Sequence, residues 1–268
     1  MDAPLSEWLN AAFRWFHVFA AILWIGQTWL FNWMENRLAE VREPGAKKAG
    51  PIWMVHGGGF YLLEKQMTLE LQEGRKLHWF KYESLATFIS GFGLFLLVYY
   101  FGGALVIPES IGLWGGIGLG VAYLIGGWIV YDLICRSPIG RNDVLTAVVV
   151  FAGLVATAFG LSRIMGGRAM FLHVGALMGT IMAANVWLRI LPNQRKVLAD
   201  KEAGREPDMS LADQAKLRSK HNSFMGVPVV FLMLSNHFYS FFSATHNWAV
   251  LAGILVVGGI AAKILRSH

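Results

Sequence analysis

Cysteine is almost absent from this sequence, because Cys135 is the only one among 268 residues. A single cysteine excludes a disulfide framework, a zinc site built from cysteines, an iron–sulfur cluster and the CxxCH motif that attaches c-type haem. Charge is also scarce: Asp, Glu, Lys and Arg make up 15% of the chain, whereas soluble domains contain about 25%. Any metal or haem site must therefore rest mainly on the 8 histidines and 11 methionines.

Long apolar runs are what the sequence has in abundance. Hydrophobic residues make up 55% of the chain, and several continuously apolar stretches approach the ~20 residues that a membrane-spanning helix needs. The seven stretches are residues 8–34, 84–107, 111–134, 144–162, 169–191, 223–243 and 246–265. The sequence therefore predicts an all-α polytopic membrane protein, with one transmembrane helical domain over residues 1–268. Residues 52–71 are too polar to span, and we expect an interfacial or re-entrant helix there.

The basic residues predict how this bundle is oriented. Twenty of the 23 Lys and Arg residues lie in four segments that seven spans place on one face, namely residues 35–83, 135–143, 189–222 and the C-terminal tail. Because Lys and Arg collect in cytoplasmic loops, we expect the N-terminus outside and the C-terminus in the cytoplasm. The net charge of +6 then marks orientation, and no nucleic-acid partner is needed to explain it.

Three histidines from different spans fall at a similar depth near the outer face: His17, His173 and His237. Histidines at matched depth are how helix bundles build cofactor sites, although each one alone is more often a core residue bonded to a neighbouring carbonyl. With no cysteine ligand available, haem b held by two imidazoles is the favoured guest, and a copper or zinc site is the alternative. Arg14, one turn before His17, is placed either to pair with haem propionates or to reach the interface.

A second polar group is expected at the cytoplasmic face, where it can bind a planar polar substrate or hold a second haem. It comprises His56, His78, Lys81, Glu83, Asn185 and His221. His56 opens a run of three glycines, whose backbone N–H groups can approach a ligand closely, although glycine runs also make plain turns. Asp132, near the inner end of the third span, either reaches the interface or serves a proton path.

Several motifs together resemble the membrane domain of the bacterial membrane-bound urate hydroxylase (urate oxidase) family. The resemblance extends from residue 8 to about residue 245, which identifies the chain more specifically than any single motif does. The matching stretches are Arg14–His17, Trp24–Gly26, Val55–Tyr61, Leu77–Glu83, Phe171–Ala176, Asn185–Trp187, Pro192–Lys196, Arg218–Asn222, Pro228 and Ser235–His237.

The resemblance implies a protein of the bacterial inner membrane that oxidises urate to 5-hydroxyisourate and passes electrons to a cytochrome c. Members of this family typically carry a further span and a C-terminal cytochrome c domain, and this sequence ends at His268 without either. We therefore expect either a separate cytochrome c as acceptor or a truncated or altered relative of the family. The resemblance also implies one or two haem b groups, no c-type haem attached to this chain, and a protein that can form homo-oligomers. The histidines carried over as haem or active-site residues are His17, His56, His78, His173, His221 and His237.

Two other functions are compatible with the same residues. One is a membrane b-type cytochrome that relays electrons from a quinol. The other is a copper- or metal-handling membrane protein, which the scattered methionines and the lack of a clear inverted repeat disfavour.

Overall fold

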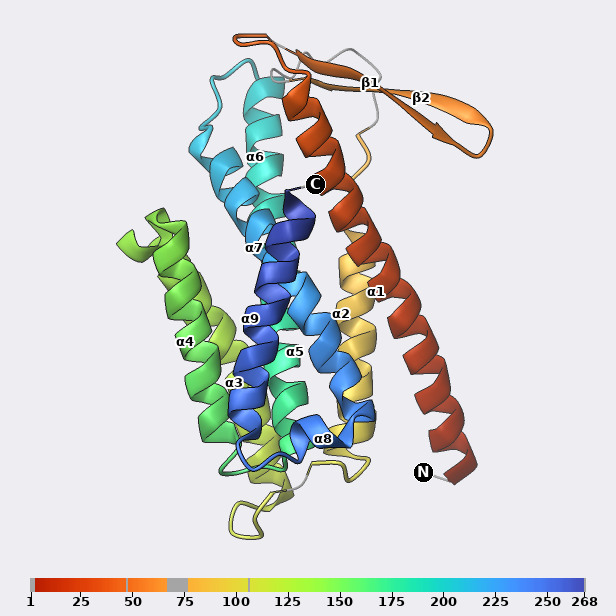
Figure 1. The fold of residues 1–268 in the computed structure, drawn as a ribbon, viewed down its shortest axis with the longest axis vertical. Helices are drawn as coiled ribbons and strands as arrows, with labels where there is room; N and C mark the ends of the chain where they lie inside the picture. The colour runs from red at the N-terminus through yellow and green to blue at the C-terminus, as the bar shows by residue number, and fades with distance from the viewer. Residues whose placement is uncertain (1–2, 47, 67–76, 106, 268) are drawn as a thin grey trace.

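The computed structural model describes residues 3–46, 48–66, 77–105 and 107–267, and it shows a bundle of long helices with a small β-hairpin at one end (Figure 1). The longer helices are α1 (Ala3–Glu40), α2 (Tyr82–Leu94), α3 (Gly112–Arg136), α4 (Asp143–Leu161), α5 (Gly167–Asn185), α6 (Leu191–Glu202), α7 (Ser210–Leu234) and α9 (Asn247–Arg266). The short helical segments are η1 (Phe95–Tyr100), η2 (Pro138–Arg141), η3 (Val186–Ile190), η4 (Ser235–His237) and α8 (Tyr239–Phe242). The hairpin consists of β1 (Lys48–His56) and β2 (Gly59–Gln66).

Six helical segments in the described part of the chain are long and apolar enough to cross a membrane. Two of these segments combine several elements, because η1 extends α2 and η3 joins α5 to α6. The six segments are Leu5–Glu40, Tyr82–Tyr100, Gly112–Arg136, Asp143–Leu161, Gly167–Glu202 and Asn247–Arg266. These segments correspond to six of the seven predicted spans, and they indicate a helical membrane protein, to which the structure adds one β-hairpin. Large apolar side chains on α1, α3, α4 and α9 are exposed, as they are on helices that face lipid.

The sixth predicted span, residues 223–243, is not a single helix in the structure. α7 starts well before it with a polar first half, and it ends at Leu234. The chain then turns through η4 and α8, which lies across the end of the bundle (Figure 1). The turn is fixed by Asn236, whose Oδ1 accepts hydrogen bonds from Tyr99 Oη at 2.7 Å and from Arg168 Nε at 2.9 Å.

The second predicted span, residues 84–107, is also shorter than expected. Its helix begins at Tyr82 and ends with η1 at Tyr100, before Gly102 and Gly103. Gly103 has a φ of 76°, a backbone conformation that residues other than glycine rarely adopt. A right-handed helix cannot continue through this angle.

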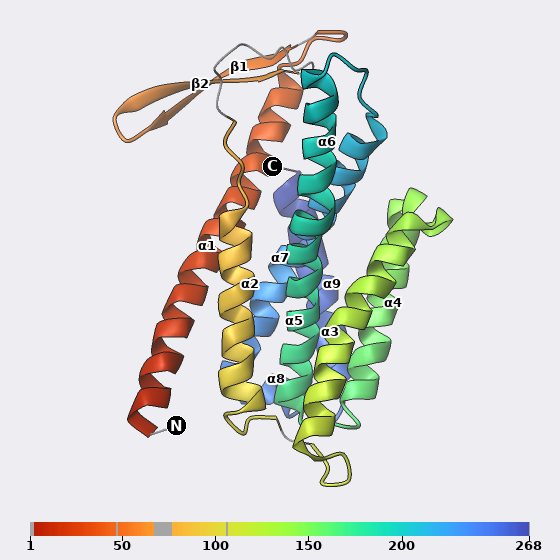
Figure 2. The same cartoon turned by 180° about the vertical axis from the view of Figure 1, so that it is seen from behind.

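α5 is the central helix of the bundle. Of its most apolar stretch, 72% is buried inside the protein, compared with 6% for α1. It packs against α2, α3, α4 and α7 (Figure 2). A histidine or an asparagine on α5 therefore lies inside the protein and not against lipid.

The predicted helix over residues 52–71 is wrong where the structure describes it. Residues 48–66 form the β1–β2 hairpin, and residues 67–71 lie outside the described residues. His56 pairs with Gly59, and the two glycines between them, Gly57 and Gly58, have φ of 57° and 78°. Two consecutive positive φ angles define the type I′ turn that suits a tight hairpin. The glycine run thus makes a plain turn.

The two ends of the bundle differ in what they carry. The start of α1 and the end of α9 lie at opposite ends (Figure 1). The hairpin, α6 and the α3–α4 connection gather at the end where α9 finishes (Figures 1 and 2). This arrangement brings the strongly basic segments to one end, as the sequence requires. That this end faces the cytoplasm stays a prediction.

Candidate functional site

His173 lies on α5 with no exposed surface. Its Nδ1 is 2.8 Å from the carbonyl oxygen of Ala169, so Nδ1 carries the proton and donates it to that carbonyl. Nε2 then presents a lone pair, and it has no hydrogen-bond partner among the described residues. The ring of Phe95 packs against it with a centroid distance of 4.7 Å. A histidine anchored through Nδ1 with Nε2 free is the arrangement that metal-binding histidines adopt.

Tyr100 is a neighbour of His173 that sequence reasoning missed. It comes from η1, its side chain is almost completely buried, and its hydroxyl likewise has no partner in the described part of the chain. Both unpaired atoms face Gly120 of α3, where a Cβ would lie 2.3 Å from Tyr100 Oη and 2.8 Å from His173 Nε2. The Tyr100 hydroxyl and the His173 Nε2 lone pair thus both lie against Gly120, where only glycine fits without a shift of these side chains. Tyr100 gave no sequence signal because it is one aromatic residue in an apolar run.

His17, on α1, is anchored in a similar way. Its Nδ1 lies 3.0 Å from the carbonyl oxygen of Thr87 and 3.1 Å from Ser90 Oγ, both on α2. The ring lies directly against Gly91, where a Cβ would be 2.7 Å from His17 Cε1. Because a carbonyl accepts from Nδ1, Nε2 is the nitrogen with the free lone pair.

The structure does not place the other two predicted outer residues in a shared site. His237 is exposed in η4, and Arg14 is exposed on α1, where its Nε donates to Asn10 Oδ1. Among the described residues, no three His, Cys, Asp or Glu side chains come together as a metal-binding group. His17 and His173 are therefore the outer histidines that the structure holds in a ligand-like orientation.

Two of the predicted inner residues lie apart from the rest. His56 is exposed beside the turn of the hairpin, and His78 is exposed before α2, where its ring contacts Phe80 at a centroid distance of 4.5 Å. Within the described residues, no hydrogen bond or ion pair joins either histidine to the polar groups described below. That His56 and His78 meet the substrate or a haem stays a prediction.

Glu83 and Lys81 form a polar group between α1, α2 and η3. Glu83 Oε1 accepts a hydrogen bond from Gln27 Nε2 at 3.0 Å, whereas its Oε2 is buried and has no partner among the described residues. Lys81 Nζ lies 5.9 Å from the ring centroid of Trp187 on η3. Trp187 is itself held by a hydrogen bond from Nε1 to Ser84 Oγ at 3.2 Å. Ser84, the residue after Glu83, thus ties Trp187 to the start of α2, where Lys81 and Glu83 lie.

Asn185 and His221 belong to a buried network at the junction of α3, α5 and α7. Asn185 Nδ2 donates to Asn222 Oδ1 at 2.9 Å and to Tyr131 Oη at 3.1 Å. Tyr131 Oη lies 2.8 Å from His221 Nδ1. Burial, followed by the nearby charge of Arg218, lowers the pKa of His221 to about 4. His221 is therefore neutral at pH 7 and links to Tyr131 as an uncharged partner.

Asp132 is the anionic centre of this network. Arg218 NH2 donates to its Oδ1 at 2.7 Å, Arg189 Nε donates to the same oxygen at 2.8 Å, and Arg189 NH2 pairs with its Oδ2. The Asp132 and Arg218 side chains are almost fully buried. Sequence reasoning singled out Asp132 as an interface residue or a proton carrier, and it missed both arginines because they sit in a segment that reads as a basic loop.

The two polar groups differ in how completely they are satisfied. Asp132 and Asn185 have their side-chain donors and acceptors occupied by protein partners, which is the pattern of a structural network. Glu83 keeps one buried carboxylate oxygen unpaired, which is costly unless something binds it. Among the described residues, Glu83 thus keeps a free buried acceptor and Asn185 does not; that either of them meets a ligand stays a prediction.

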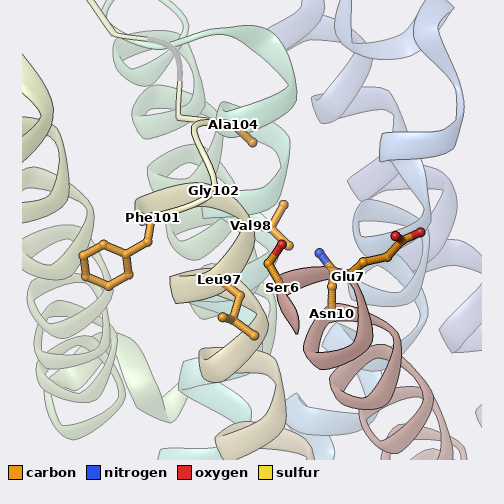
Figure 3. A pocket seen from close by; sticks show the side chains of 8 residues that line it. All are labelled: Ser6, Glu7, Asn10, Leu97, Val98, Phe101, Gly102 and Ala104. Atoms are coloured by element: carbon orange, nitrogen blue, oxygen red, sulfur yellow. The ribbon is translucent and has the colours of Figure 1, made fainter. Parts of the chain in front are cut away.

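A cavity lies at the opposite end of the protein from the hairpin, between the start of α1 and the end of η1 (Figure 3). It has a volume of about 410 Å³ and is lined on the α1 side by Ser6, Glu7 and Asn10. Leu97 and Val98 form part of the η1 side. None of the predicted site residues lines it.

The fold and these buried groups define the class: a polytopic helical membrane protein with ionisable side chains and two ligand-like histidines inside the bundle. The chain belongs to the urate oxidase N-terminal family, whose model matches residues 3–267. Neither a curated protein nor a solved structure matches the chain. Family membership makes this a urate-related oxidoreductase and agrees with the resemblance found in the sequence.

Proposed function

We propose that this protein oxidises urate to 5-hydroxyisourate within the membrane and passes the electrons to a separate cytochrome c. In this reaction urate and one water yield 5-hydroxyisourate, two protons and two electrons, and cytochrome c is the one-electron acceptor. The observation that carries the proposal is the unpaired, buried Oε2 of Glu83 in a chain of the urate oxidase family.

Urate is a planar anion at pH 7, and its oxidation requires a base. Lys81 supplies a positive charge beside the substrate, and the ring of Trp187 supplies a flat surface against which a purine can stack. Glu83 Oε2 accepts a proton from bound urate, while Gln27 holds the other carboxylate oxygen and fixes its orientation. The sequence predicts Lys81 and Glu83 as members of the substrate site without assigning either a role, and Gln27 and Trp187 complete the group proposed here.

The Asp132 network supports this site without touching the substrate. Arg189 lies on η3, two residues beyond Trp187, and its bonds to Asp132 tie η3 to α3. Asn185, at the end of α5, is tied to α7 through Asn222. The network thus fixes the segment that carries Trp187 and, with it, one wall of the proposed site.

His173 fits the ligand of a haem b iron, because its Nε2 is buried and unpaired and its Nδ1 is anchored. His17 offers a second imidazole with the same anchoring. Haem b bound there supplies a one-electron carrier between urate and the outer face. In the protein itself, the surrounding aromatic rings of Phe95 and Tyr99 exclude water from His173.

Purified protein in lipid vesicles tests the proposal. With urate and oxidised cytochrome c, we expect urate to disappear, 5-hydroxyisourate to form, and two cytochromes to be reduced for each urate. An assay with a quinol in place of urate is the control. Cytochrome c reduction by the quinol but not by urate would contradict the proposal and favour a quinol-oxidising b-type cytochrome.

A further inference from the structure

Next to its turn, the β1–β2 hairpin has one face that carries only apolar side chains. The register pairs Trp53 with Leu62 and Val55 with Phe60, and directly paired residues project from the same face of a hairpin. All four are exposed, with 76% of Phe60 and 67% of Trp53 accessible. A two-stranded hairpin needs a surface to pack on, because it is marginally stable in water by itself.

Polarity changes along the length of the hairpin. The apolar pairs lie next to the Gly57–Gly58 turn, whereas the charged residues lie at the base of the hairpin. There Lys48 forms an ion pair with Glu64, and Lys65 forms one with Glu35 of α1. The first pair joins the two strands, and the Lys65–Glu35 pair ties the base of the hairpin to α1. The apolar tip is left to contact something else.

The direction of the hairpin indicates what that is. It projects sideways past α1 from one end of the bundle, and its outer part slopes back toward the level of the helices (Figures 1 and 2). For a bundle that crosses a membrane, this is where the lipid surface lies. The same end carries the strongly basic segments, so the leaflet beside it attracts these segments when its lipids are anionic.

We propose that the β1–β2 hairpin is a lipid-contacting arm, and that Trp53, Val55, Phe60 and Leu62 rest in the interfacial region of an anionic leaflet. Tryptophan and phenylalanine side chains favour this region of the bilayer. The arm is independent of the urate site, so the two proposals stand or fall separately.

Photo-crosslinking identifies the occupant of this face. Phe60→p-benzoylphenylalanine places the probe on the apolar face, and Tyr61→p-benzoylphenylalanine is the matched control because Tyr61 projects from the opposite face. The full chain is reconstituted in vesicles of phosphatidylethanolamine with phosphatidylglycerol, irradiated, and analysed by mass spectrometry and gel electrophoresis. Trp53→p-benzoylphenylalanine provides a second probe on the apolar face if the first variant does not insert.

We expect several-fold more lipid adduct from position 60 than from position 61, and less adduct when phosphatidylcholine replaces the anionic lipid. A crosslinked dimer from position 60 would overturn the proposal and assign this face to a second copy of the chain. The absence of lipid adduct from both apolar-face probes would overturn it as well, because the face would then lie in water.

Discussion

Tyr100 Oη and His173 Nε2 are aimed at the same backbone position, that of Gly120 on α3. A hydroxyl from η1 and an imidazole from α5 thereby share one point inside the bundle, and neither has another partner in the described part of the chain. This relationship makes Gly120 a position where even one added methyl group meets two side chains.

Gly120→Ala should destabilise the protein by about 1–3 kcal/mol, because the new Cβ forces Tyr100 and His173 to move. Gly118→Ala is the matched control on the same helix, where a Cβ meets nothing within 4 Å. The measurement is thermal unfolding of both variants in the same detergent. Equal melting temperatures for the two variants would contradict the close packing of Tyr100 and His173 against Gly120.

His173→Ala should abolish the Soret band of protein that is purified with haem bound, since the variant removes the proposed iron ligand. His246→Ala, an exposed histidine, should leave the spectrum unchanged. A pyridine haemochrome assay gives the haem content of each variant. Full haem loading and an unaltered spectrum in His173→Ala would remove this residue from the haem site.

Asp132→Asn should cost about 3–5 kcal/mol of stability, because it leaves the buried charge of Arg218 without its partner. The control is Asp143→Asn, which breaks an exposed pair with Lys220 and should cost about 0–1 kcal/mol. Chemical unfolding of the two variants provides the comparison. If Asp132→Asn were as mild as the control, the Asp132 network would not hold η3 in place.

His221 should make stability depend on pH. Its pKa is about 4 in the folded protein and 6.5 when unperturbed, so the unfolded chain binds a proton between these values and the folded protein does not. The contribution is fully present above pH 6.5 and is lost as the pH falls toward 4. As the pH is lowered across this range, the melting temperature should fall more steeply for the natural protein than for His221→Gln. The same dependence on pH in both proteins would contradict the assignment.

Much of the fold was predictable from the sequence because apolar runs of spanning length have few alternatives in a membrane. The sequence did not predict the hairpin, because the apolar side chains of residues 48–66 follow neither a clear helix period nor a clear strand period. The turn depends on the positive φ angles of Gly57 and Gly58. The end of α7 escaped because a polar residue, Asn236, bonds to two neighbours that are distant in the sequence.

The site was predictable only where a residue type by itself signals chemistry. Histidines in spans are conspicuous, so the sequence singled out His17, His173 and His237. The structure anchors the first two through Nδ1 and leaves His237 exposed, and that they bind haem stays a prediction. Tyr100 and Gln27 stand out only through their neighbours across the bundle, and no local sequence pattern reveals such neighbours. The pairing of Asp132 with Arg218 depends likewise on how α3 packs near α7.

The central claim is that Glu83 is the base that receives a proton from urate. Steady-state urate oxidation by Glu83→Gln tests it most directly, with Glu64→Gln on the exposed hairpin as the matched control. We expect kcat to fall by about 10²–10⁴-fold in Glu83→Gln with a much smaller change in KM, because the amide keeps the shape but cannot accept the proton. A Glu83→Gln variant that turns over urate at the rate of Glu64→Gln would contradict the account.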